Sequence, residues 1–125
     1  MSQSTKGEYT VIPWSDVAFF IDKVKQYCAS KHFTGVYGIP RGGLVLAVMV
    51  SYRTGLPLLQ APAKGCLIID DISDSGKTLL HYKEKGYTIA TMCYKESSLV
   101  EPDMYYRKTE EWVVFPWEGG YDESK

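Results

Sequence analysis

The chain lacks the charge balance and the hydrophobic runs that would point to nucleic acid, a membrane or secretion. Its 14 Lys and Arg residues against 15 Asp and Glu residues give a formal net charge of −1, so no overall positive field favours nucleic-acid binding. No apolar stretch reaches the roughly 18 residues of a membrane span, and the N-terminal segment MSQSTKGEYT lacks the basic-then-apolar layout of a secretory signal. We therefore expect a cytoplasmic protein that has neither a membrane nor nucleic acid among its partners.

Cysteines are also too few and too scattered for a disulfide framework or a zinc site. Cys28, Cys66 and Cys93 stand inside apolar segments without metal-ligand spacing, and an odd number of buried thiols fits a reducing compartment. At 125 residues, with 45% hydrophobic and 23% charged residues, the chain has the size and composition of one domain with its own core. We expect a single domain over residues 1–125, with its core at about 9–118 and a loose tail at 119–125.

What the sequence does contain is one unusual stretch, residues 66–80 (CLIIDDISDSGKTLL). Its apolar run ends in two adjacent acids, Asp70 and Asp71, and a turn of small polar residues leads to a predicted helix that begins at Lys77. An unbroken apolar run is typical of a parallel strand covered on both faces. The unpaired backbone N–H groups at a helix N-terminus bind phosphate. The stretch therefore predicts a phosphate site, with two carboxylates beside it for a sugar hydroxyl or a divalent cation.

This stretch has two other interpretations. A P-loop would need a glycine where Asp71 stands, and a carboxylate there would face the phosphates, so a P-loop is excluded. A strand, turn and helix with no ligand is the second alternative, because paired acids at a strand end are often a solvated turn with an N-cap.

A second candidate ligand turn lies upstream, at Pro40-Arg41-Gly42-Gly43. It follows a predicted strand at 34–39 and precedes an apolar helix that starts near residue 44 and ends near Gly55. Glycines at such a turn let the backbone approach an anion, and Arg41 offers a forked donor that suits phosphate oxygens. The alternative is a tight strand-to-helix connection with an incidental arginine.

The remaining segments alternate strands with helices, which predicts an α/β protein with a parallel sheet. We expect a strand within 8–13, a helix capped by Ser15, a helix at 77–85 that stops at Gly86, and strands at 56–60, 87–94 and 104–106. The helix after Ser15 has an apolar face with three- and four-residue spacing, formed by Val17, Phe20, Ile21, Val24 and Cys28. In such folds the ligand turns lie at the carboxyl ends of the strands.

The segment LIIDDISDSGKT resembles the phosphoribosyl-pyrophosphate signature of type I phosphoribosyltransferases, and the resemblance extends over about residues 9–118. That signature is a hydrophobic run, two acids, two mostly apolar or small residues, Asp, and then Ser/Thr-Gly-x-Thr. Residues 38–43 are similar to the pyrophosphate loop of the xanthine-guanine branch, with Pro40 at the usual serine position. Members of the family often have a cis peptide before this arginine. The resemblance implies a Rossmann-like parallel sheet with helices on both faces and a small C-terminal hood.

The resemblance also implies a reaction: transfer of 5-phosphoribosyl from phosphoribosyl pyrophosphate to a 6-oxopurine with the help of Mg²⁺. Asp74 is then the general base, Asp70 and Asp71 accept from the ribose hydroxyls, and Asp71 is also a ligand of the Mg²⁺ ion. The pyrophosphate is expected at Arg41, Gly42 and Gly43. The 5′-phosphate is expected at Ser75, Gly76, Lys77 and Thr78.

Two positions near the C-terminus carry the expected purine selectivity. Lys95 ends a predicted strand, where the 6-oxopurine branch has a lysine that donates to the purine 6-oxo group; by position alone it is a surface charge. The pattern Trp-x-x-x-Pro-Trp-(Asp/Glu) at 112–118 resembles the end of xanthine-guanine enzymes. It implies that Trp112 stacks on the base and that the backbone of Val113 contacts its edge. Clustered aromatics near a terminus also form core or dimer contacts, and we expect Trp117 to be structural and the protein to be a homodimer.

The main departure from the family pattern is the connection at residues 56–65, which is too short for the mobile loop that closes over the sugar in catalytic relatives. A non-catalytic or regulatory nucleotide-binding protein is therefore an alternative. Transfer to another base, such as orotate, uracil or adenine, is a second one. RNA binding has scattered lysines alone in its favour. The sequence does not choose among guanine, xanthine and hypoxanthine.

Overall fold

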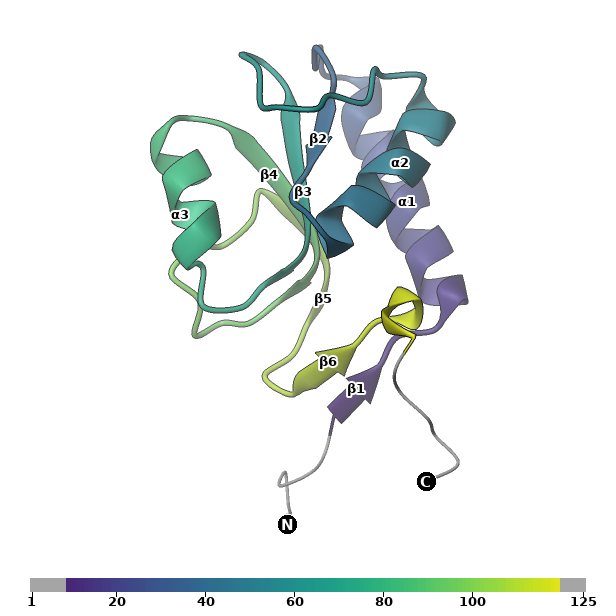
Figure 1. The fold of residues 1–125 in the computed structure, drawn as a ribbon, viewed down its shortest axis with the longest axis vertical. Coiled ribbons are helices and arrows are strands. Elements are labelled where there is room, and N and C mark those ends of the chain that lie inside the picture. The colour runs from purple at the N-terminus through teal and green to yellow at the C-terminus, as the bar shows by residue number, and fades with distance from the viewer. Residues whose placement is uncertain (1–8, 120–125) are drawn as a thin grey trace.

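The computed structural model describes residues 9–119, and a four-stranded sheet lies at their centre. Its strands run in the order β2 (Val36–Gly38), β3 (Leu67–Ser73), β4 (Thr88–Tyr94) and β5 (Met104–Lys108). Each neighbouring pair is parallel, so all the carboxyl ends lie at one edge. The predicted α/β class with a parallel sheet is confirmed (Figure 1).

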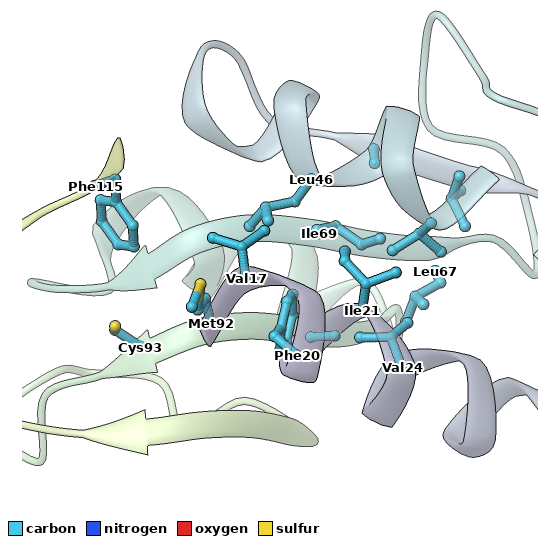
Figure 2. Close-up of a cluster of buried hydrophobic side chains, with 14 of the residues drawn as sticks. Val17, Phe20, Ile21, Val24, Leu46, Leu67, Ile69, Met92, Cys93 and Phe115 are labelled. Atoms are coloured by element: carbon cyan, nitrogen blue, oxygen red, sulfur yellow. The ribbon is translucent and has the colours of Figure 1, made fainter. Parts of the chain in front are cut away.

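Helices cover both faces of this sheet, as predicted. Helices α1 (Trp14–Ala29) and α2 (Gly42–Thr54) pack on one face, and α3 (Lys77–Glu84) packs on the other (Figure 1). The larger core cluster joins the apolar face of α1, the inner side of α2 and alternate residues of β3 and β4, including Phe20, Leu46 and Ile69 (Figure 2). A smaller cluster under α3 holds Ile68, Leu79 and Ile89. Because β3 is covered on both faces, its apolar run has no polar position.

The order of the strands reverses beside β2. From β2 the chain passes through α2 to Leu58, which forms a parallel bridge to Val36, and then returns to β3 on the opposite side of β2. In open α/β sheets the ligand crevice lies at this kind of switch point, outside the carboxyl ends of the strands. The topology therefore predicts a site between the ends of β2 and β3.

A second, two-stranded parallel sheet forms a small hood near the carboxyl edge of the main sheet. It pairs β1 (Tyr9–Val11) with β6 (Trp112–Val114), and a short 3-10 helix, η1 (Pro116–Glu118), follows β6. Figure 1 shows the hood below the carboxyl ends of β3 to β5. The ends of the described chain thus meet beside the predicted site.

Several boundaries differ from the sequence-based predictions. The N-cap of α1 is Pro13 instead of Ser15, because proline adopts the extended backbone of an N-cap and its carbonyl accepts from Asp16 N and Val17 N at 3.0 and 3.3 Å. Strand β3 does not end at Asp70; it continues to Ser73, because β4 supplies backbone partners along that whole length. The predicted strand at 56–60 is wrong, since only Leu58 within it pairs with the sheet.

The predictions for two helix ends and for the cysteines are confirmed. Gly55 and Gly86 follow α2 and α3 with left-handed backbones, and the three cysteines are buried free thiols. The bond between Pro40 and Arg41, which the sequence left open, is cis. No helix within residues 9–119 is long and apolar enough to cross a membrane. The tail expected at 119–125 lies, apart from Gly119, outside the described residues.

The two adjacent phenylalanines of α1 provide a stability test. Phe20 is 0% exposed in the larger core cluster, whereas Phe19 is 60% exposed. We expect Phe20→Ala to lower the free energy of unfolding by about 3–5 kcal/mol, because it removes buried apolar surface and leaves a cavity. We expect Phe19→Ala, the matched control, to change it by less than about 0.5 kcal/mol. Urea unfolding of both variants measures the difference, and equal effects would contradict the packing described for α1.

Candidate functional site

A cleft of about 630 Å³ opens at the switch point between β2 and β3. Its lining comes from the turn before α2, the first turn of α2, the end of β3 and the short helix of the hood. These residues are Arg41, Gly42, Val45, Asp71, Trp117 and Glu118. A guanidinium and a carboxylate therefore share one cleft with an indole ring.

The turn before α2 lies directly against the two acids of β3, and its glycines make this approach possible. A Cβ on Gly42 would overlap the Asp71 carboxylate, and a Cβ on Gly43 would overlap the carbonyl oxygen of Ile69. Strand β2 ends at Gly38, which pairs with Ile69. The turn therefore lies where further residues of β2 would otherwise pair with Asp70 and Asp71. The two glycines therefore allow the turn to contact the acids, because they have no side chain there. The sequence did not indicate this role.

The two acids share a poorly hydrated corner of the site. The backbone N–H of Asp71 donates to Asp70 Oδ1 at 2.8 Å. Burial, followed by the charge of Asp71, raises the pKa of Asp70 to about 8. Burial also raises the pKa of Asp71, while a side-chain hydrogen bond from Asp70 lowers it. The pair therefore holds a proton near neutral pH, because two adjacent carboxylates in low dielectric cannot both ionise easily.

The turn after β3 forms a second, smaller hollow of about 100 Å³ beside the cleft. Gly76, with a left-handed backbone, stands at the N-cap of α3, and Lys77 N lies 3.3 Å from Ser75 Oγ. A helix start beside the hollow suits an anion, because the first backbone N–H groups of a helix have no partners within the helix. The lining residues are Asp70, Ile72, Asp74, Ser75, Gly76, Lys77, Thr78 and Leu79.

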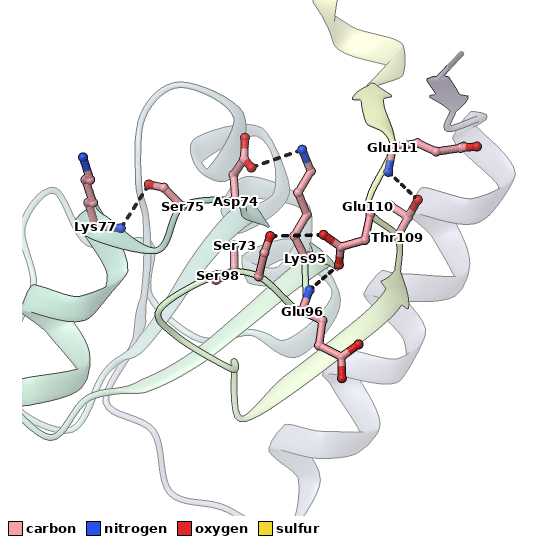
Figure 3. Close-up of polar contacts among 11 residues, drawn as sticks. Ser73, Asp74, Ser75, Lys77, Lys95, Glu96, Ser98, Thr109, Glu110 and Glu111 are labelled. Carbon is pink, nitrogen blue, oxygen red and sulfur yellow. Dashed lines mark hydrogen bonds and ion pairs between the residues drawn. The ribbon is translucent and has the colours of Figure 1, made fainter. Parts of the chain in front are cut away.

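Lys95, the first residue after β4, turns toward this hollow. Its side chain is 15% exposed, and its Nζ lies 3.2 Å from Oδ1 of Asp74, whose side chain is 57% exposed. Figure 3 shows the two side chains facing each other across the ends of β3 and β4. The sequence placed these residues at neighbouring strand ends, and the structure pairs them.

The hood residues are placed differently from the expectation. Trp112 is 66% exposed on β6 and lines neither the cleft nor the hollow; its stacking role stays a prediction, as does the role of Val113, which is buried. Trp117, expected to be structural, lines the cleft and packs flat on Phe115 with ring centroids 5.0 Å apart. Val45 was also missed, although it follows Arg41 by one helical turn and so shares its face. No comparable signal marked Trp117, because η1 reaches the cleft only through the hood.

The carboxylate of Asp71 at the cleft suits a cation whose remaining ligands come from the substrate and from water. Within residues 9–119, no three His, Cys, Asp or Glu side chains converge as a protein-made metal site. Mg²⁺ prefers hard oxygen ligands and is commonly held by one or two carboxylates together with substrate phosphates and water. Asp71, at the cleft beside Arg41, fits that pattern.

Comparison with known proteins shows which family has this arrangement. The family model described as "Phosphoribosyl transferase domain" matches residues 59–124. A purine phosphoribosyltransferase from Pyrococcus horikoshii OT3 is 30% identical, with a TM-score of 0.79 over 94% of this chain and 99% of that one. A xanthine-guanine-hypoxanthine phosphoribosyltransferase from Helicobacter pylori has a TM-score of 0.72 at 20% identity over 90% and 95%.

An adenine phosphoribosyltransferase from Thermoanaerobacter pseudethanolicus shares the fold at lower similarity, with a TM-score of 0.56 at 14% identity over 74% of this chain and 79% of that one. The fold therefore occurs with different purine bases. The match to more than half of the chain, together with the Pyrococcus relative, confirms the resemblance found in the sequence. This chain belongs to the phosphoribosyltransferase family and is a transferase with its type I α/β fold.

Proposed function

We propose that the protein transfers 5-phosphoribosyl from phosphoribosyl pyrophosphate to a 6-oxopurine (guanine, xanthine or hypoxanthine), giving the nucleoside monophosphate and pyrophosphate. The observation that carries this proposal is the pairing of Lys95 with Asp74 beside the turn of α3. It supports the proposal because a base bound beside this turn would meet both a cation and a carboxylate. The two relatives named for purine transfer support the same substrate class.

Lys95 is suited to read the 6-position of the base. An ammonium group has three donors and no acceptor, so it can bind a 6-oxo group but not the 6-amino group of adenine. Asp74 pairs with this ammonium group, whose side chain is largely buried, and a base that offers no acceptor leaves a further N–H of Lys95 poorly hydrated and unpaired. Selection against adenine follows from that cost.

Asp74 is suited to accept a proton from the incoming base. Its carboxylate is partly exposed and is held toward Lys95 by the 3.2 Å ion pair. In this position it can act as a general base while the ribose carbon changes partners, a contribution of about 10²–10⁴-fold. The reacting carbon passes through an oxocarbenium-like state, as at other glycosidic centres.

The other residues of the site are suited to bind the pyrophosphate, the 5′-phosphate and the sugar. Arg41, with the backbone at Gly42 and Gly43, is suited to the pyrophosphate; the start of α3, with Lys77, is suited to the 5′-phosphate. Asp70 and Asp71 can accept from the ribose 2′- and 3′-hydroxyls. Asp71 would also hold a Mg²⁺ ion, and the ion when bound neutralises charge on the leaving pyrophosphate.

A nucleotide-binding protein without turnover is the second candidate, and the connection between α2 and β3 favours it. This connection is fastened to the first residue of β2: Val36 N donates to the Pro57 carbonyl at 2.9 Å, and Leu59 N donates to the Val36 carbonyl at 2.8 Å. None of residues 56–65 lines the cleft or the hollow. The site therefore stays open where a closing loop would otherwise exclude water. A homodimer and a cytoplasmic location remain predictions.

Base choice distinguishes these functions. With phosphoribosyl pyrophosphate and Mg²⁺, we expect nucleotide product from at least one 6-oxopurine, at a rate about 100-fold or more above that with adenine. Lys95→Met should lower the rate with the 6-oxopurine by a similar factor, while Lys108→Met, a change to an exposed lysine, should not. Product formation is followed by chromatography. Equal rates with adenine would contradict the role of Lys95, and binding of guanosine monophosphate without single-turnover product would favour the non-catalytic candidate.

The general-base assignment has its own test. Asp74→Asn should lower kcat by about 10²–10⁴-fold, while the Kd for guanosine monophosphate, measured by calorimetry, should change by only a few-fold. The matched control is Asp22→Asn, which removes a carboxylate paired with Arg53 on the outer surface of α1. Unchanged kcat in the Asp74 variant would refute the assignment.

The acid pair predicts a pH dependence of stability. The pKa of Asp70 rises from 3.8 in its reference state to about 8 in the folded protein. Between these values the folded state binds more protons than the unfolded state, so the free energy of unfolding falls as pH rises through this window. We expect the fall between about pH 5 and about pH 8.5 to be smaller in Asp70→Asn than in the wild type. Urea unfolding at both pH values measures it, and parallel pH profiles would argue against a shared proton.

A further inference from the structure

The loop after β4 is fastened onto the turn after β3. Lys95 N donates to the Ser73 carbonyl at 3.0 Å, and Leu99 N donates to the Ser75 carbonyl at 2.9 Å. With the ion pair from Lys95 to Asp74, the loop at 95–100 contacts the turn at 73–76 through both backbone and side chains. Figure 3 shows the loop passing close to the turn, with Ser98 beside Ser73.

The centre of this contact is a pair of hydroxyls, of which that of Ser73 is buried and that of Ser98 is partly buried. Ser73 is fully buried, its hydroxyl lies 2.7 Å from the Val100 carbonyl, and its Oγ lies 2.8 Å from Ser98 Oγ. Ser98 Oγ also accepts from Val100 N at 3.1 Å. Removing the Ser98 hydroxyl would leave Val100 N without this partner and would leave Ser73 with the Val100 carbonyl alone. Such losses are costly where water cannot replace the partner.

The fit between loop and turn is also tight at Gly76. A Cβ on this residue would overlap Ser98 Oγ and would lie 2.8 Å from Leu99 N and 2.9 Å from Val100 N. The left-handed backbone of Gly76 begins α3, so the loop presses on the residue that sets the start of the phosphate-binding helix. A shift of the loop would therefore be transmitted to the turn.

We propose that Ser98 is a positioning residue that fixes the distance between the 5′-phosphate subsite and the purine donor Lys95. This rests on the function proposed above, in which the turn at 75–78 holds the phosphate and Lys95 meets the base. Ser98 lines neither the cleft nor the hollow. It holds the two subsites at the spacing that one nucleotide spans, so it affects ligands that occupy both subsites more than ligands that occupy one.

The neighbouring serine is a matched control. Ser97 Oγ donates to Glu110 Oε1 at 3.1 Å, and the Glu96 N–H donates to Glu110 Oε2 at 2.6 Å; both contacts are exposed. They join the same loop to the segment before β6, away from the turn. Because water can replace an exposed hydrogen bond, Ser97→Ala should leave the turn in place.

The experiment compares a whole nucleotide with its parts. Calorimetry measures Kd for guanosine monophosphate, guanosine and ribose 5-phosphate with the wild type, Ser98→Ala, Ser73→Ala and Ser97→Ala. We expect Ser98→Ala to weaken guanosine monophosphate about five- to tenfold, the size of one net hydrogen bond, and to weaken guanosine and ribose 5-phosphate less than twofold. Ser73→Ala should repeat this pattern, and the two serine changes should not be additive because they break the same contact.

The outcomes separate the two proposals. Equal weakening of the whole nucleotide and its parts, no weakening, or the same result with Ser97→Ala would overturn the role of Ser98 alone. Failure of the wild type to bind guanosine monophosphate would overturn the proposed function together with the role that rests on it.

Discussion

The close approach of the turn at Arg41–Gly43 to the acids of β3 is the constraint on which the site depends. Gly42 and Gly43 leave no room for a Cβ against Asp71 and the backbone of Ile69. This contact sets the distance from the Arg41 turn to the paired carboxylates, and the cleft opens beside it. It also aligns the start of α2 with the end of β3, and both elements contribute to the larger core cluster. The packing of the core and the shape of the cleft therefore both depend on the close contact at Gly42 and Gly43.

The charges of the site follow from that arrangement. Asp70 and Asp71 are adjacent and partly buried, which raises the pKa of both carboxyl groups and favours a proton held by the pair. Asp74, one turn later, instead has Lys95 as its partner. The end of β3 and the turn after it therefore have two kinds of carboxylate. Asp70 and Asp71 form a pair that needs a positive partner, whereas Asp74 already has Lys95. Under the proposed function, the carboxylate pair would serve the sugar and the metal ion, and Asp74 would serve the base.

Local patterns predicted much of this protein and missed identifiable parts of it. Short-range spacing and backbone preference decide the features that were predicted, which are the apolar face of α1, the helix ends at Gly55 and Gly86 and the buried run of β3. The end of β3 was predicted too early, since pairing with β4 continues past the acids. A strand was predicted at 56–60, but at this sheet edge Leu58 alone forms a bridge to β2. Trp117 was expected to be structural, and it lines the cleft because the hood folds back on the sheet.

The sequence by itself determined the family, the parallel α/β class and the residue types of the ligand turns, because the order of strand, small-residue turn and helix encodes them locally. Tertiary structure alone decided which of those residues meet. It brought Arg41 and Asp71 to the same cleft, paired Lys95 with Asp74 and placed Ser98 against the turn at 73–76. The reason is physical: each contact depends on strand order, register and the space left by absent side chains, and no short segment specifies these.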